Sequence, residues 1–203
     1  MDPSLNRTAE RKVLFIGDSI VEGSIGESFT DIMERQNPGI FILNHGVPGD
    51  MLRGICRRLL SLLEEEVDFE GILLEGGHND ILMRDWFFQD DSADVAEELS
   101  RILDATLVKV KEKFKGPVVL ATLSCLGEDL EEEANRVRSR LNRRIMELAG
   151  KHGCQVADVG RAFDQELINR QGMGGFYLTM DGVHLNRRGA ELYAREIGKF
   201  FNT

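Results

Sequence analysis

Residues 13–20 read Val-Leu-Phe-Ile-Gly-Asp-Ser-Ile, an apolar run that stops at a glycine and passes directly into polar residues. A short apolar run without alternation is typical of a strand buried on both faces, as the strands of parallel sheets are. Four further runs of this kind follow, at residues 40–43, 72–74, 118–121 and 155–158. The sequence therefore predicts five buried strands.

Segments of helical period lie between these runs. Apolar residues recur on one face in residues 52–62, 95–114, 134–148 and 190–200. Asp50 is the expected N-cap of the first segment, and Gly150 is the expected end of the third. This alternation predicts an α/β protein, a three-layer α/β/α sandwich with a central five-stranded parallel sheet. We expect one domain spanning residues 1–203.

The charge balance and the cysteines restrict the class of protein. The 203 residues include 25 basic and 35 acidic side chains, for a net charge of −10, which predicts no nucleic-acid partner. Residues 1–11 lack the apolar core of a signal peptide, and no apolar run reaches the roughly 18 residues of a transmembrane segment. Three cysteines without a Cys-x-x-Cys pair predict reduced thiols and a cytoplasmic protein.

Polar residues follow the first three strand-like runs, and a further polar turn precedes the last helix. Ser19 follows the first run, Gly46 the second and Asn79 the third, while Asp181 and His184 share the later turn. Ligands of open α/β sheets bind beyond the carboxyl ends of the strands, so the first three segments must lie along one edge. We therefore expect the functional site at this edge.

A serine, a histidine, an aspartate and several N–H donors are the groups that acyl-transfer enzymes use. Ser19 is the candidate nucleophile, and His184 is a general base with a reference pKa of about 6.5. Asp181, three residues earlier, is spaced to bind the other imidazole N–H. The backbone N–H groups of Ser19 and Gly46 and the side-chain amide of Asn79 are expected to form an oxyanion hole.

The four segments together resemble the GDSL, or SGNH, hydrolase family of esterases and lipases. The matching segments are Phe-Ile-Gly-Asp-Ser-Ile at 15–20, Asn-His-Gly-Val-Pro-Gly-Asp at 44–50, Gly-His-Asn-Asp at 77–80 and Asp-Gly-Val-His-Leu-Asn at 181–186. The resemblance covers nearly the whole chain and implies the flavodoxin-like SGNH hydrolase fold. It implies Ser19, Asp181 and His184 as catalytic residues and Ser19, Gly46 and Asn79 as oxyanion donors. Two positions depart from it, since Val21 and His78 stand where threonine is frequent.

The resemblance implies a serine ester hydrolase that needs no cofactor and no metal. We expect short-chain carboxylic esters, small-molecule substrates bound in an open cleft. A lysophospholipase, a thioesterase or a carbohydrate O-acetyl esterase would use the same machinery, and a catalytically silent binding module is a weaker alternative. A homo-oligomer is also left open.

Two other enzyme classes fit the sequence less well. A metal site could be imagined from four side chains, but metallophosphoesterases need Asp-x-His after the first strand, where this chain has Asp18-Ser19-Ile20. Those four side chains are His45, His78, Asp80 and His184. An α/β-hydrolase needs a Gly-x-Ser-x-Gly elbow, which the chain lacks.

Several charged and aromatic residues carry weaker expectations. Asp18 and Asp80 are expected to hold loops by accepting backbone hydrogen bonds. Trp86, Phe87 and Phe88 could wall an acyl pocket, pack in the core or form a dimer contact. Glutamates 131–133 and the arginines at 136, 138, 140, 143 and 144 are expected to be solvated. Among the arginines that could meet an anionic head group, namely 53, 57, 58 and 84, only Arg53 and Arg84 lie close in sequence to the predicted site.

Overall fold

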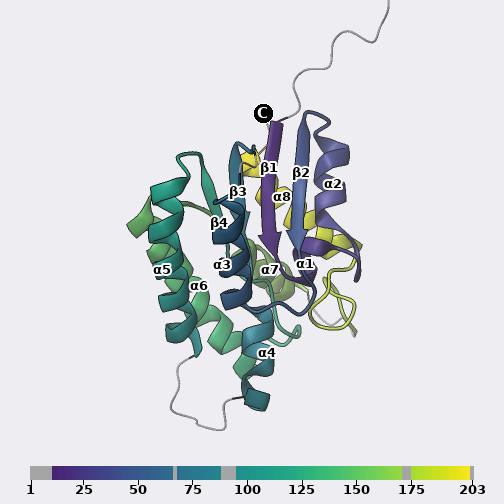
Figure 1. Ribbon diagram of the computed structural model, residues 1–203. Helices are drawn as coiled ribbons and strands as arrows, with labels where there is room; N and C mark the ends of the chain where they lie inside the picture. The colour runs from purple at the N-terminus through teal and green to yellow at the C-terminus, as the bar shows by residue number, and fades with distance from the viewer. Residues whose placement is uncertain (1–10, 66–67, 88–94, 171–174, 202–203) are drawn as a thin grey trace, which may run out of the picture.

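A parallel sheet forms the central layer of the computed structural model, which describes residues 11–65, 68–87, 95–170 and 175–201, without the side chains of 85–87. The strands are β1 (Arg11–Gly17), β2 (Ile40–Gly46), β3 (Gly71–Leu74), β4 (Val118–Ala121) and β5 (Gln155–Ala157). They lie in the order β2-β1-β3-β4-β5, with every neighbouring pair parallel (Figure 1). The five predicted strands and their parallel arrangement are confirmed.

Helices cover both faces of this sheet (Figure 1). They are α1 (Ser19–Glu22), α2 (Phe29–Gln36), α3 (Leu52–Leu62), α4 (His78–Phe87), α5 (Val95–Lys113), α6 (Glu133–His152), α7 (Val159–Asn169) and α8 (Arg187–Phe201). Helices α2, α7 and α8 pack on one face, and α3, α5 and α6 pack on the other. Alternate residues of β1 enter the two cores, Phe15 one and Leu14 the other, which explains its continuous apolar run. None of the described helices is both long enough and apolar enough to span a bilayer.

Two predicted helix ends differ from the structure. Helix α6 continues through Gly150 and ends at Gly153, whose φ of +63° supplies the left-handed residue that commonly terminates a helix. The N-cap position of α3 is Met51 rather than Asp50. The Asp50 carboxylate instead binds Arg58, eight residues further along the chain and within α3, at 2.8 Å. An ion pair has therefore replaced the expected cap.

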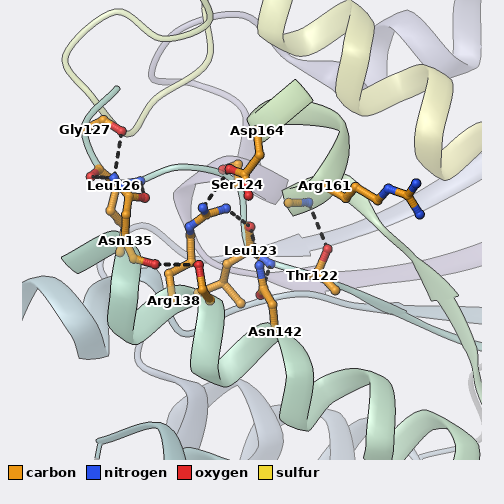
Figure 2. A network of polar contacts seen from close by, with 12 residues as sticks. Thr122, Leu123, Ser124, Leu126, Gly127, Asn135, Arg138, Asn142, Arg161 and Asp164 are labelled. Atoms are coloured by element: carbon orange, nitrogen blue, oxygen red, sulfur yellow. Dashed lines mark hydrogen bonds and ion pairs between the residues drawn. The ribbon is translucent and has the colours of Figure 1, made fainter. Parts of the chain in front are cut away.

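Arg138 contradicts the expectation that the arginines of α6 are solvated. Its side chain is 2% exposed, binds Asp164 Oδ1 at 2.7 Å and donates to Leu123 O at 3.3 Å (Figure 2). Asn142, one turn further along α6, both accepts from Leu123 N and donates to Leu123 O. A charged side chain can be buried when it is paired, and both terminal nitrogens of Arg138 have partners, whereas its Nε has none among the described residues. The network fixes the segment that follows β4.

Candidate active site

Ser19 lies where β1 ends and α1 begins, at the carboxyl edge of the sheet. Asp18 holds this turn, because its Oδ1 accepts the Ile20 N–H at 3.0 Å, as was predicted for this carboxylate. The Ser19 side chain is almost fully buried, at 5% exposure. As the first residue of a helix, Ser19 has a backbone N–H without an intrahelical acceptor. The hydroxyl and this N–H therefore stand at the same point.

Ser19, His184 and Asp181 form one chain of hydrogen bonds. Ser19 Oγ lies 3.0 Å from His184 Nε2, and His184 Nδ1 lies 2.7 Å from Asp181 Oδ2. Asp181 Oδ1 accepts from the backbone N–H groups of Val183 and His184 at 3.0 and 2.8 Å. Burial raises the pKa of Asp181, but the hydrogen bonds from His184 and Val183 outweigh it and leave that pKa below its ordinary value. The carboxylate is thus ionised and aligned with the imidazole.

The loop that carries His184 is itself anchored on both sides. On one side, the segment after α1 binds this loop, because the Glu27 N–H donates to Leu185 O at 2.8 Å. On the other side, Glu128 Oε1 accepts from the N–H groups of Leu178 and Thr179 at 2.7 and 2.9 Å. These hydrogen bonds lower the pKa of Glu128 in spite of its burial. His184 is therefore presented to Ser19 by a fixed loop.

Asn79 stands in the first turn of α4, beside the turn that follows β2. Its Nδ2 donates to Asp50 O at 3.0 Å and lies 3.5 Å from Asp18 Oδ2. Asp80, the next residue, accepts the Leu52 N–H at 2.8 Å, which confirms the loop-holding role predicted for it. The end of β3 and the turn after β2 are joined through these contacts.

Gly46 does not offer a free N–H in this arrangement. Its N–H donates to Asn44 Oδ1 at 3.0 Å. A Cβ at this position would lie 2.1 Å from Glu22 N, so the glycine is required for the close approach of β2 to α1. The Gly46 N–H thus has an acceptor within its own segment, and the role of Gly46 as an oxyanion donor stays a prediction.

Gly49, three residues later, is a second candidate donor that was not predicted from the sequence. The segment Val47–Asp50 is a turn in which Asp50 N–H donates to Val47 O at 3.1 Å, with Pro48 and a Gly49 φ of +75° in the central positions. These are the features of a type II turn, whose own hydrogen bond does not use the third residue's N–H. The Gly49 N–H has no hydrogen-bond acceptor among the described residues. The Pro-Gly pair is the sequence signal for it.

His78 belongs to a buried ionic cluster directly beneath the nucleophile turn. Its Nδ1 lies 3.0 Å from Glu75 Oε1 and 3.7 Å from Asp18 Oδ2, and its Nε2 lies 3.1 Å from Ser124 Oγ. Burial lowers the pKa of His78, but the two carboxylates outweigh burial and raise it to about 9. Burial and Asp18 raise the pKa of Glu75. His78 thus balances charge in the core rather than facing the substrate.

Among the described residues, the same cluster is also a set of side chains close enough together to hold a metal ion. Asp18, Glu75 and His78 each offer an atom within 4.8 Å of the others. Of the four ligands considered from the sequence, only His78 belongs to this cluster. His184 instead binds Asp181, and Asp80 binds the backbone N–H of Leu52. His78 forms an ion pair with Glu75 through Nδ1 and contacts the Ser124 hydroxyl through Nε2.

The other residues noted in the sequence divide between the surface and the undescribed part of the chain. Arg53 pairs with Glu98 at 3.3 Å, and Arg84 lies 3.8 Å from Glu133. The side chains of Trp86 and Phe87 and the whole of Phe88 lie outside the described structure, so their expected role stays a prediction.

A groove of about 970 Å³ begins at the loop of residues 181–183 and runs between the segment after β4 and the end of α7. Its apolar lining includes Leu82 of α4 and Val183, which precedes His184. The remaining apolar side chains that line it are Leu126, Leu130, Ala134, Leu167, Ile168 and Phe176. Ile168 and Phe176 are 69% and 52% exposed, so this wall is open to solvent.

Carboxylates outnumber cations along this groove. Glu128 and Arg170 pair with each other at 2.5 Å, and Glu131 lies 3.7 Å from Arg136. Asp129 and Glu132 also line the groove, and Glu132 Oε2 would lie 3.1 Å from a Cβ placed on Gly127. Glutamates 131 and 132 are exposed, as expected, and they also line the groove.

Three solved structures have the same fold over nearly their whole length. LAE5, an alpha/beta hydrolase enzyme from the metagenome of Lake Arreo, Spain, is 21% identical, with a TM-score of 0.78 and 95% of each chain covered. A lipolytic protein G-D-S-L family member from Veillonella parvula is 21% identical, with a TM-score of 0.76 and coverage of 94% of this chain and 98% of the other. Axe2, an acetylxylan esterase from Geobacillus stearothermophilus, is 20% identical, with a TM-score of 0.74 and coverage of 96% and 95%. At these identities the likeness concerns the fold.

The family is established by sequence. No curated protein matches this chain. The family model of the GDSL-like lipases and acylhydrolases, however, matches residues 15–192, which include Ser19, Asn79, Asp181 and His184. The fold and the sequence thus agree, and the chain belongs to the GDSL-like lipase/acylhydrolase family of carboxylic ester hydrolases.

Proposed function

We propose that the protein hydrolyses esters through a covalent acyl-enzyme on Ser19. The observation that carries this proposal is the continuous hydrogen-bonded chain from Ser19 Oγ through His184 to Asp181. Ser19 Oγ attacks the ester carbonyl carbon while His184 Nε2 takes the hydroxyl proton. The bond to the alcohol then breaks, and His184 returns the proton to the departing oxygen. Water repeats the sequence on the acyl-enzyme and releases the acid and free Ser19.

The developing oxyanion is assigned three donors. They are the Ser19 N–H, the Asn79 amide and the Gly49 N–H, the last in place of Gly46, whose N–H is occupied by Asn44. The Asn79 amide carries two hydrogens: one is donated to the carbonyl of Asp50, the residue after Gly49, and the other has only the longer 3.5 Å contact to Asp18 Oδ2. The bond to Asp50 supports placing the Asn79 and Gly49 donors together. Donors fixed before the reaction stabilise the transition state without reorganisation.

The substrate class is proposed to be short-chain carboxylic esters of uncharged or cationic alcohols. The open, partly apolar groove that begins at Val183 supports a small ester in an accessible cleft. Its excess of carboxylates, together with the net charge of −10, disfavours the anionic coenzyme A thioesters among the alternatives. A carbohydrate acetyl ester, which is uncharged, is the second candidate that this groove favours. The unpaired thiols of Cys56, Cys125 and Cys154 support a cytoplasmic location.

Labelling with a fluorophosphonate tests the nucleophile without a choice of substrate. We expect one adduct by intact mass on the wild type, one on Ser24→Ala, which removes an exposed serine, and none on folded Ser19→Ala. A p-nitrophenyl ester series of increasing chain length then measures acyl preference. An unlabelled wild type, or a labelled Ser19→Ala, contradicts the proposed mechanism.

A further inference from the structure

Arg58 of α3 binds two backbone carbonyls and one carboxylate at the carboxyl edge of the sheet. Its Nη1 donates to His45 O at 2.6 Å, and its Nη2 donates to Gly17 O at 2.9 Å. Its Nε donates to Asp50 Oδ2 at 2.9 Å. All three guanidinium nitrogens are therefore used, and the side chain is 26% exposed.

Two of these three partners lie within two positions of a residue of the proposed active site. Gly17 lies two positions before Ser19 at the end of β1. Asp50 follows Gly49, and its carbonyl accepts the Asn79 amide at 3.0 Å. The Gly17 carbonyl also accepts the Val47 N–H at 3.1 Å, so the turn that carries Gly49 is tied to β1 at both of its ends.

The first turn of α3 is shaped to admit the Asp50 carboxylate. A Cβ at Gly54 would lie 1.9 Å from Asp50 Oδ1. Any other residue at position 54 would therefore displace the carboxylate from Arg58. The ion pair thus depends on a close approach that only glycine allows.

We propose that Arg58 is a positioning residue that holds the oxyanion donors Gly49 and Asn79 in line with Ser19. The proposal rests on the ester hydrolysis proposed above. The planar guanidinium can bind two carbonyls and a carboxylate at once, which a lysine ammonium on a flexible stem cannot do with the same geometry. Without it, Asp50 loses its ionic partner, and its carbonyl is free to move together with the Asn79 amide. Arg58 does not contact substrate in this role.

Turnover of matched variants provides the first test. We expect Arg58→Ala to lower kcat on a p-nitrophenyl ester by about 10–100-fold with KM changed less than about threefold, because displacement of a donor by about 1 Å costs about that much. Arg58→Lys keeps the charge but is expected to recover little of the rate. Millimolar guanidinium is expected to restore part of the rate of Arg58→Ala only. Arg57→Ala, which removes an exposed arginine from the same helix, is expected to keep the wild-type kcat.

Amide hydrogen exchange provides a second readout that needs no ester. In Arg58→Ala, exchange in residues 47–50 should rise about tenfold or more, and in Arg57→Ala it should stay at the wild-type rate. Equal kcat values in the two variants, at a temperature where both are folded, would overturn the proposal, as would unchanged exchange. A wild type that hydrolyses no ester while exchange responds as expected contradicts the proposed function and leaves the tie between Arg58 and the turn in place.

Discussion

His78 Nδ1 lies 3.0 Å from Glu75 Oε1 in the core, where the two side chains are 1% and 0% exposed. The folded-state pKa of His78, about 9, exceeds its reference of about 6.5. Protonated His78 therefore contributes its full stabilisation of the folded state below pH 6.5, and this contribution is lost as the pH rises through 9. The raised pKa of Glu75 acts in the same direction, because the folded state again binds more protons than the unfolded state.

The thermal stability of the protein should accordingly fall at alkaline pH. We expect Tm to fall by about 4–8 °C between pH 6.5 and 9.5, which corresponds to a loss on the order of 2 kcal/mol. His78→Gln should be less stable at pH 6.5 and show a flatter dependence, whereas His45→Gln should follow the wild type. A wild-type Tm that rises over this interval would show that His78 is neutral in the folded protein.

Asn79→Ala tests the side-chain oxyanion donor. We expect kcat to fall by about 10²–10³ with a small change in KM, because the lost hydrogen bond is made to the charge that develops in the transition state. The variant also loses the bond to Asp50 O, so its Tm should be measured with the kinetics. A tenfold rise in KM at constant kcat would instead identify Asn79 as a substrate-binding residue.

Alanine substitutions at the two glycines after β2 should have different consequences. Gly46→Ala should fold poorly, because its Cβ would meet Glu22 N at 2.1 Å. Gly49→Ala meets nothing within 4 Å, and its positive φ should cost only about 1–2 kcal/mol. We expect Gly49→Ala to be folded by circular dichroism yet slower in kcat. A fully active Gly49→Ala would remove this residue from the oxyanion hole.

Charge discrimination should follow from the acidic groove. With hydroxide-catalysed rates as the reference, 4-trimethylammoniophenyl acetate should have a kcat/KM at least about fivefold above that of 4-carboxyphenyl acetate in low salt, and the ratio should shrink in 0.5 M salt. Glu132→Gln should reduce the ratio, and Glu112→Gln, at the end of α5, should not. Equal rates for the two esters would mean that the groove carboxylates do not reach the substrate.

The buried Arg138 should make α7 and α6 interdependent. Asp164→Ala leaves the guanidinium without its ionic partner and should cost about 3 kcal/mol, or about 6–12 °C in Tm. Arg136→Ala, which removes a 60% exposed side chain from the same helix, should change the free energy of unfolding by less than about 0.5 kcal/mol. Similar Tm losses in the two variants would contradict the difference in their environments.

The fold was predictable because its signals are local and repeated. Each strand contains a short apolar run, and in β1 alternate side chains enter two cores, which explains why the run is continuous. The first three strands are followed by polar residues of the candidate site. The contact between Ser19 and His184 could be expected from their residue types and from the family resemblance. Residue type, strand position and the family resemblance sufficed for these features.

Features that depend on contacts distant in sequence could not be predicted. Two glycines follow β2, and only the contact with Glu22 shows that Gly46 serves packing. Asp50 is a residue type that commonly caps helices, but its carboxylate binds Arg58 of α3 instead. Arg138 differs from its neighbours in sequence only by facing Asp164. In each case the partner, rather than the residue itself, decides the role.

The contact between Ser19 and His184 joins positions 165 residues apart. During synthesis the nucleophile leaves the ribosome long before its base exists, and the early strands can pair before the last loop is made. Closing so long a loop is slow compared with local pairing. Ester hydrolysis should therefore return late in refolding, after the far-ultraviolet signal, and the enzyme's own activity reports the last step of its folding.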